Sequence, residues 1–422
     1  MKTEYLDEYA CLDRRTFLRL VAIVSAGAAL PWVFARDVLS MQSHGPRKRV
    51  ALTGIKNGPR KRVALTGIKR GSGDHLLIEA VKDAARAATD FSWLSRGDVV
   101  LIKPALNSGN PYPATTSSVG IRAMVELLKE KGARKVIVSD MSGVEHVKLT
   151  REKLKGSSRE LMKKSGMAEA AIKAGAELYF PEEDGWGAFF EDGPQDSSHW
   201  KGAIMMSKIL KEVDHLVLMP RCGRHVLLGS SLGMKAAVGY WRTDSRLEYH
   251  KDASTIQEKT ADANTVPSIL DKQRLVLTTA TKILTTHGPD KGFVSEPETG
   301  LVIASESVVA HDMISLAWLI ENRAAMSQEE KKGSRDFYRT QFLVSNINRL
   351  VVVLLGGLAE AWNTEKLVRN DLNTIWDDRV LNRAYEVFGG VPEVTLVDGE
   401  KAVSRDIKKK LTEMVTKPIQ KL

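Results

Sequence analysis

Polar and charged residues follow four predicted strands of the chain, after the point where each strand ends. These strands are residues 98–102, 135–139, 215–219 and 274–279. The residues that follow them are Lys103, Asn107, Asp140, Ser142, Arg224, His225, Lys235 and His287. Continuous apolar runs of this length are typical of buried parallel strands. Because the carboxyl ends of parallel strands meet at one edge of a sheet, where α/β proteins bind ligands, the sequence predicts one site at this edge.

The predicted substrate-binding residues combine positive charge with hydrogen-bond donors. They are Lys103, Asn107, Ser142, Arg224, Lys235 and His287. Lysine and arginine side chains hold phosphate or carboxylate oxygens, and the glycine-rich turns nearby offer backbone amides. The set therefore predicts an anionic small molecule as ligand. The alternatives are a solvated lysine at a strand end for Lys103 and, for Lys235, an ammonium that reaches solvent from an apolar stretch.

Acid–base chemistry or metal binding is predicted for Asp140, His225 and Asp312, which form the candidate catalytic set. A carboxylate accepts a proton or binds a cation, and an imidazole does either near neutral pH. Asp140 and His225 are also the candidate metal ligands, so a divalent metal is a candidate cofactor. Both aspartates have a structural alternative, because either could cap a helix.

Other binding and catalytic motifs are missing from the sequence. The glycine-rich residues 70–74 lack the spacing of a dinucleotide-binding loop, and there is no phosphate-binding P-loop, HExxH or GxSxG. The sequence has no zinc finger and no sustained basic helix, so nucleic acid is not an expected partner. The net charge of +10 then indicates solubility, an anionic ligand or peripheral contact with anionic lipid.

Arg14 and Arg15 begin a pattern typical of a twin-arginine export signal. An apolar run follows over residues 20–30, and Ala35 offers a cleavage position. The run is shorter than the roughly 20 residues that span a bilayer. We therefore expect export in folded form, through the twin-arginine machinery, to a periplasmic or extracytoplasmic location. Retention as an uncleaved anchor is the alternative.

The cysteine content limits the cofactors. The chain has two cysteines, and Cys11 lies in the predicted signal, so Cys222 is the one thiol expected in the exported form. Neither a cysteine-ligated iron–sulfur cluster nor an intramolecular disulfide is therefore expected.

Strands and helices alternate along most of the chain, which predicts an α/β fold with a mostly parallel open sheet and helices on both faces. Towards the C-terminus the pattern turns mainly helical, with one last strand at residues 392–397. The expected units are a signal peptide (1–35), a linker (36–61), the α/β domain (62–320) and a mainly helical C-terminal region (321–422).

An internal duplication falls at the start of the α/β domain, where residues 45–56 recur unchanged as residues 58–69. Only the second copy leads directly into a helical pattern, so we expect it to be the first core strand. The remaining expected elements are strands at 177–180 and 301–304, helices at 119–130, 160–174, 207–213 and 309–321, and a long loop at 181–201.

Together these segments resemble the family catalogued as domain of unknown function 362. The resemblance is carried by residues 96–107, 132–143, 215–239 and 287–289, together with Asp312. It covers roughly residues 63–320 and implies an α/β fold with a shared site at the strand ends. Ala105 and Ala236 stand where the family has asparagine, residues 221–224 replace a lysine-rich stretch, and the ferredoxin-like cluster segment of many relatives is missing.

Two functions are compatible with this sequence. The first is an exported enzyme that binds an anionic small molecule at the strand ends, with a metal or an organic cofactor and with redox chemistry as one form of the reaction. The second is a non-catalytic protein that binds a ligand or helps to assemble a metalloenzyme, with the helical C-terminal region as its partner surface.

Overall fold

The computed structural model describes residues 56–195, 197–327, 330, 341–370 and 372–416. The predicted signal peptide, most of the linker and all but the last residue of the first copy of the duplication lie outside these residues. The second copy lies within strand β1 (Asn57–Lys69), and Val63 to Leu65 are fully buried there, so its prediction as the first core strand is confirmed.

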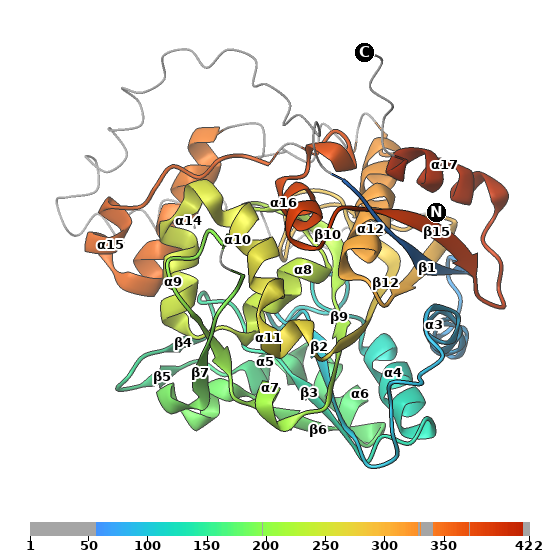
Figure 1. Cartoon of the computed structure of the whole chain (residues 1–422), viewed down its shortest axis with the longest axis horizontal. Helices are drawn as coiled ribbons and strands as arrows, with labels where there is room; N and C mark the ends of the chain where they lie inside the picture. The colour runs from blue at the N-terminus through green and yellow to red at the C-terminus, as the bar shows by residue number, and fades with distance from the viewer. Residues whose placement is uncertain (1–55, 196, 328–329, 331–340, 371, 417–422) are drawn as a thin grey trace. The chain divides into compact units, whose positions relative to one another are not determined.

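A large mixed sheet organises the described residues (Figure 1), and its main path runs in the order β15-β1-β14-β12-β9-β2-β3-β6. The other strands of this path are β2 (Val99–Pro104), β3 (Lys135–Ser139), β6 (Glu177–Tyr179), β9 (His215–Met219), β12 (Gln273–Leu284), β14 (Thr299–Ser305) and β15 (Val391–Asp398). Neighbouring strands are parallel except at β14, which is antiparallel to both β1 and β12. The mostly parallel open sheet is therefore confirmed.

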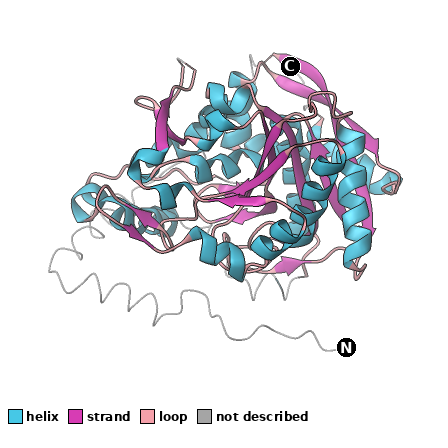
Figure 2. Cartoon of the chain, turned by 90° about the horizontal axis from the view of Figure 1, so that it is seen from below, coloured by secondary structure: helices cyan, strands magenta, loops and turns pink. Residues whose placement is uncertain are grey.

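Helices cover both faces of the sheet (Figure 2). One face packs against α3 (Asp74–Ala88), α4 (Ser118–Glu130), α5 (Ser158–Lys164) and α6 (Met167–Lys173). The other packs against α7 (Ile209–Glu212), α8 (Gly233–Ala236), α9 (Thr243–Lys251), α10 (Ile256–Asp262), α11 (Pro267–Leu270), α12 (Val308–Ala324), α14 (Gln341–Gly356), α16 (Arg379–Val387) and α17 (Arg405–Val415). Alternate residues of β2 join opposite cores, which is why its sequence is apolar throughout.

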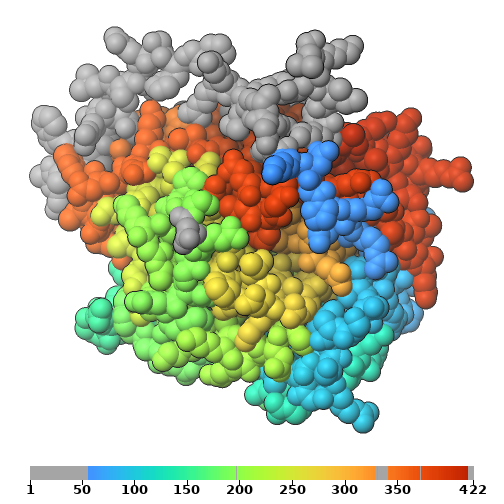
Figure 3. Space-filling view, in the orientation of Figure 1, coloured from blue at the N-terminus to red at the C-terminus, as the bar shows by residue number. Residues whose placement is uncertain are grey.

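The C-terminal strand belongs to the same sheet as the first strand. β15 pairs in parallel with β1, and Figure 3 shows the red C-terminal residues beside the blue start of the described chain. Helix α15 (Leu358–Trp362) follows α14. None of the described helices combines the length and apolar character needed to cross a membrane.

Three local predictions differ from the structure. The expected helix at 160–174 is two helices, because Gly166 adopts the left-handed conformation (φ +81°) between α5 and α6. The helix expected at 207–213 shrinks to the single turn of α7. The expected loop at 181–201 contains β7 (Phe189–Asp192), which pairs with β8 (Ile204–Ser207).

Small strands branch from the ends of the main sheet. β10 (Arg221–His225) continues directly from β9 and pairs with β12 and with β11 (Gly229–Ser231), while β13 (Val294–Ser295) pairs with the end of β12. A hairpin of β4 (Lys148–Leu149) and β5 (Leu154–Lys155) follows β3. All these additions lie after strands whose ends were predicted to form the site.

Candidate functional site

Hydrogen bonds link the segments that leave β2, β3 and β12. After β2, the Leu106 amide donates to Asp140 Oδ2 (2.8 Å), and the Asn107 carbonyl accepts from Ser142 Oγ (3.1 Å). The Asn107 side chain also donates to Asp290 Oδ1 (2.8 Å) in the loop after β12. The parallel sheet therefore brings the predicted strand ends to one edge, as the sequence predicts.

Lys103 and Asp140 form a buried ion pair at the centre of this edge. Lys103 Nζ lies 2.9 Å from Asp140 Oδ1 and donates to the Pro104 carbonyl (2.8 Å). Burial lowers the pKa of Lys103 and raises the pKa of Asp140, and in each case the partner's charge opposes the shift. Both carboxylate oxygens of Asp140 already contact a donor, so the pair is suited to orienting its surroundings more than to binding a metal.

Gly239 packs directly against this ion pair. A Cβ atom at Gly239 would lie 1.7 Å from Asp140 Oδ1 and 2.5 Å from Lys103 Nζ, so the buried ion pair would have to move to admit it. The Gly239 carbonyl also accepts from the Met141 amide (3.2 Å). Glycine is therefore required here by close approach, since the backbone after α8 lies on the two charged groups.

Lys235, in α8, lies half-buried among other cations. Burial lowers its pKa from 10.5 to about 7, and the charges of Arg221, Arg246 and Lys103 add to the effect, while Asp140 opposes it. Within the described part of the chain, its ammonium has no hydrogen bond or ion pair. An amine in this setting gains strongly from an anion beside it.

His225 is held as a neutral imidazole. Its Nδ1 accepts from the amides of Leu227 (3.2 Å) and Leu228 (3.4 Å), so the ring proton is assigned to Nε2. Burial lowers the pKa of His225 well below 6.5, and the charges of Lys235 and Arg221 lower it further. With Nδ1 occupied, only Nε2 is available for proton transfer or for a ligand.

Asp312 binds the backbone at the start of α8. Its Oδ1 accepts from the Gly233 amide (2.8 Å), its Oδ2 accepts from the Met234 amide (2.9 Å), and His311 Nδ1 lies 2.8 Å from Oδ1. These contacts hold the turn that carries Lys235. The alternative role of Asp312 as the cap of its own helix is not realised, because Asp312 lies inside α12 and Ser307 caps that helix. A catalytic role for Asp312 stays a prediction, but its contacts describe a positioning residue.

The remaining predicted residues surround this centre. Ser142 is buried, and its amide donates to Ser158 Oγ (2.9 Å). Arg224 is buried in β10, and the turn at His287 packs against it, because a Cβ at Gly288 would lie 1.8 Å from the Arg224 carbonyl oxygen. His287 itself has a positive φ of 52°. The turn thus joins the β10 and β12 ends.

Arg246 is a site residue that the sequence did not indicate. From α9 it donates to the Met141 carbonyl (2.8 Å), the Trp241 carbonyl (3.0 Å) and the Ser142 carbonyl, and so fixes the segment after β3. Burial lowers its pKa to about 10, opposed by the charge of Asp140. It lies far from any strand end in sequence, so no local signal points to it.

Tyr240 is the second residue that was missed. Its ring lies under Lys103 Nζ (5.4 Å to the centroid), and its hydroxyl is buried without a hydrogen-bond partner in the described residues. Burial raises its pKa well above 10, and the charge of Asp140 adds to this. A buried hydroxyl in this state is one that a bound ligand or water would satisfy.

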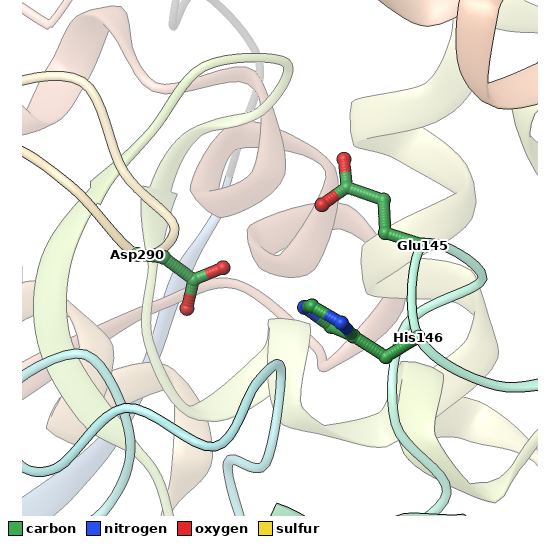
Figure 4. Close-up of side chains that lie close together, drawn as sticks. All are labelled: Glu145, His146 and Asp290. Atoms are coloured by element: carbon green, nitrogen blue, oxygen red, sulfur yellow. The ribbon is translucent and has the colours of Figure 1, made fainter. Parts of the chain in front are cut away.

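Glu145, His146 and Asp290 form a third group at the same edge (Figure 4). One ligand atom from each lies within 4.8 Å of the others. Crowding by protein atoms and the charge of Asp290 raise the pKa of Glu145, although solvent reaches its side chain. Reading a few residues further past the strand-end segments at 140–143 and 287–289 would have found all three.

The predicted metal ligands Asp140 and His225 have no third histidine, cysteine or carboxylate side chain beside them at metal-binding spacing among the described residues. Among the described residues, the one group of three or more histidine, cysteine or carboxylate side chains with suitable spacing is Glu145, His146 and Asp290, and it includes neither Asp140 nor His225. Cys222 is buried, and its pKa is raised to about 12 by that burial, so it is an unreactive core thiol.

A family model described as "Domain of unknown function (DUF362)" matches residues 100–317, just over half of the 422 residues. The chain belongs to the DUF362 family. The match spans every predicted site residue from Lys103 to Asp312, so the family resemblance of the strand-end segments is confirmed. A search of curated proteins finds no match for this DUF362 chain.

Two solved structures share low similarity with the DUF362 chain. One is a Thermotoga maritima protein solved by a structural genomics consortium, with 12% identity and a TM-score of 0.31 over 50% of this chain, which spans about half (51%) of that protein. The other is the lactate racemase apoprotein from Thermoanaerobacterium thermosaccharolyticum, with 12% identity and a TM-score of 0.39 over 88% of each chain. Likeness at this level supports no inference about activity.

Proposed function

We propose that this DUF362 protein is an enzyme that binds an anionic small molecule at the carboxyl ends of its sheet, beside Lys235. One observation carries the proposal: the Lys235 ammonium is half-buried among three other cations and has no acceptor within the described residues. A phosphate or carboxylate group there would supply the missing negative charge and hydrogen-bond acceptor.

Each neighbouring residue has a proposed role in this site. The Lys103–Asp140 ion pair orients the backbone after β2, and Arg246 fixes the segment after β3. The buried hydroxyl of Tyr240 offers a further polar contact. The neutral His225 has Nε2 for proton transfer, since Nδ1 accepts from two amides. A metal or an organic cofactor, with redox chemistry as one form of the reaction, belongs to the same proposal.

The proposed location follows from the N-terminal residues alone. The pair Arg14 and Arg15 with the apolar run behind it supports export by the twin-arginine route to an extracytoplasmic compartment. With one cysteine beyond the signal, the exported protein would carry no cysteine-ligated cluster. The net charge of +10 would also permit peripheral contact with anionic lipid.

A non-catalytic ligand-binding or metalloenzyme-assembly protein is the second candidate, and one observation favours it. The three predicted catalytic side chains are largely occupied by protein groups: both oxygens of Asp140, both oxygens of Asp312 and Nδ1 of His225. A binding protein needs the cations around Lys235 but no free acid or base.

Calorimetric titration with sulfate, inorganic phosphate and a set of dicarboxylates tests the anion site. We expect Lys235→Met to weaken binding at least 10-fold at about pH 6. Lys409→Met removes the same charge from an exposed position of α17 and should leave the affinity unchanged apart from a small screened effect. Equal binding by wild type and Lys235→Met would refute the site. If the site holds, loss of turnover in His225→Ala with retained binding would favour the enzyme over the binding protein.

A further inference from the structure

The group formed by Glu145, His146 and Asp290 has the ligand chemistry of a metal site. An imidazole nitrogen and two carboxylate oxygens lie within 4.8 Å of one another, and Figure 4 shows the three side chains turned towards a common space. Atoms bound to one cation at about 2.0–2.2 Å are themselves about 3–4 Å apart, so small rotamer adjustments would complete the coordination.

The three residues come from two different strand ends. Glu145 and His146 lie in the segment after β3, where the amides of His146 and Val147 both donate to the Gly143 carbonyl (3.0 Å each). Asp290 lies in the loop after β12. A site assembled from separate loops on a shared rigid sheet is the usual construction for a ligand site in this class of fold.

Asp290 is oriented by two donors that, among the described residues, both contact the same carboxylate oxygen. Asn107 Nδ2 (2.8 Å) and Ser108 Oγ (2.6 Å) both donate to Oδ1, and Ser108 is buried. Oδ2 is left for another partner. Outer donors that fix a carboxylate while one oxygen remains available are typical of the surroundings of metal ligands.

Two carboxylates and one imidazole meet at this position. Neither Glu145 nor Asp290 takes part in an ion pair within the described residues, although the two carboxylates face each other. Like charges at this separation repel, and a cation between them would turn the repulsion into attraction.

We propose that Glu145, His146 and Asp290 bind one divalent transition-metal cation at the edge of the sheet. A mixed set of one imidazole and two carboxylates suits Zn²⁺, Mn²⁺ or Fe²⁺, whereas Mg²⁺ and Ca²⁺ prefer oxygen ligands alone. Three protein ligands leave at least one coordination position open. This site is separate from the predicted metal pair of Asp140 and His225, and it does not depend on the proposed anion site.

Metal binding by the full chain tests the proposal directly. The purified protein is stripped with a chelator and titrated with Zn²⁺ and with Mn²⁺ by calorimetry, and the bound metal is counted by elemental analysis. We expect one equivalent per chain, and at least 10-fold weaker binding in His146→Ala and in Asp290→Asn. Glu152→Gln and His75→Ala change exposed residues of the same types outside the group and should bind like wild type.

A thermal melt of each variant without metal separates folding from binding. His146 is exposed, so His146→Ala should melt like wild type yet lose the metal-induced rise in Tm. Absence of stoichiometric binding, or equal binding by wild type, His146→Ala and Asp290→Asn, would overturn the metal site. The anion titration is run on the same variants, so the two proposals can fail separately. If metal binding is absent while Lys235→Met still loses the anion and His146→Ala keeps it, the metal site fails and the proposed anion site stands.

Discussion

Lys235 gives the proposed anion site a pH dependence that an ordinary lysine would not have. Its pKa is lowered to about 7 from 10.5, chiefly by burial and then by Arg221, Arg246 and Lys103. The anion should bind only the protonated amine. The affinity for the anion should therefore be highest well below pH 7 and fall as the pH rises through 7. An exposed lysine would stay charged until about pH 10.

The magnitude follows from this pKa. At about pH 6 roughly nine-tenths of Lys235 is protonated, and at about pH 9 roughly one-hundredth, so the affinity should fall about 100-fold, or about 2.7 kcal/mol. The two nearby histidines add nothing over this range, because the pKa of His250 is about 4 and that of His225 is well below 6.5.

Calorimetric titration with sulfate across this range is the assay, because sulfate keeps its charge throughout. Lys235→Met should bind weakly at every pH and lose the slope. A flat profile in the wild type, or an equal slope in Lys235→Met, would refute the argument that the Lys235 ammonium holds the anion. Binding should also take up a proton when measured above pH 7, which buffers of different ionisation enthalpy would report.

Three further predictions concern the frame of the site. Gly239→Ala should destabilise the protein by about 3–5 kcal/mol in urea unfolding, since its methyl group would displace the buried ion pair. Gly202→Ala is the control: a Cβ there meets nothing within 4 Å, so this variant should lose under about 1 kcal/mol of stability. Asp312→Ala should lower the free energy of unfolding by about 1–3 kcal/mol, because two buried amides lose their acceptor. It should also weaken anion binding, because the turn that carries Lys235 would shift. Unchanged anion affinity in a folded variant would contradict this coupling. Cys222 should resist alkylation at about pH 8 in the native protein and react fully in urea, as judged by intact mass, because burial raises its pKa to about 12; rapid native labelling would mean that β10 opens.

Much of the fold was predictable because its signals are local. The apolar runs of β2, β3 and β9 mark strands buried on both faces, and the structure places them within one or two residues of the expected bounds. The predictions were wrong where a single backbone feature decides, as at Gly166, or where short strands form only by pairing, as in β7 and β8. Such strands have too few residues to show a period.

The sequence by itself determined the α/β class, the family and the strand ends at which charged residues gather, because each depends on patterns a few residues long. Only the tertiary structure decided which charges neutralise one another. Asp140 is paired with Lys103, Asp312 accepts from the first two amides of α8, and burial lowers the pKa of Lys235 to about 7, with the charges of Arg221, Arg246 and Lys103 adding to the effect. Arg246 and Asp290 reach the edge from segments more than 100 residues after Asp140 and Asn107, so their roles depend on contacts that no local pattern records.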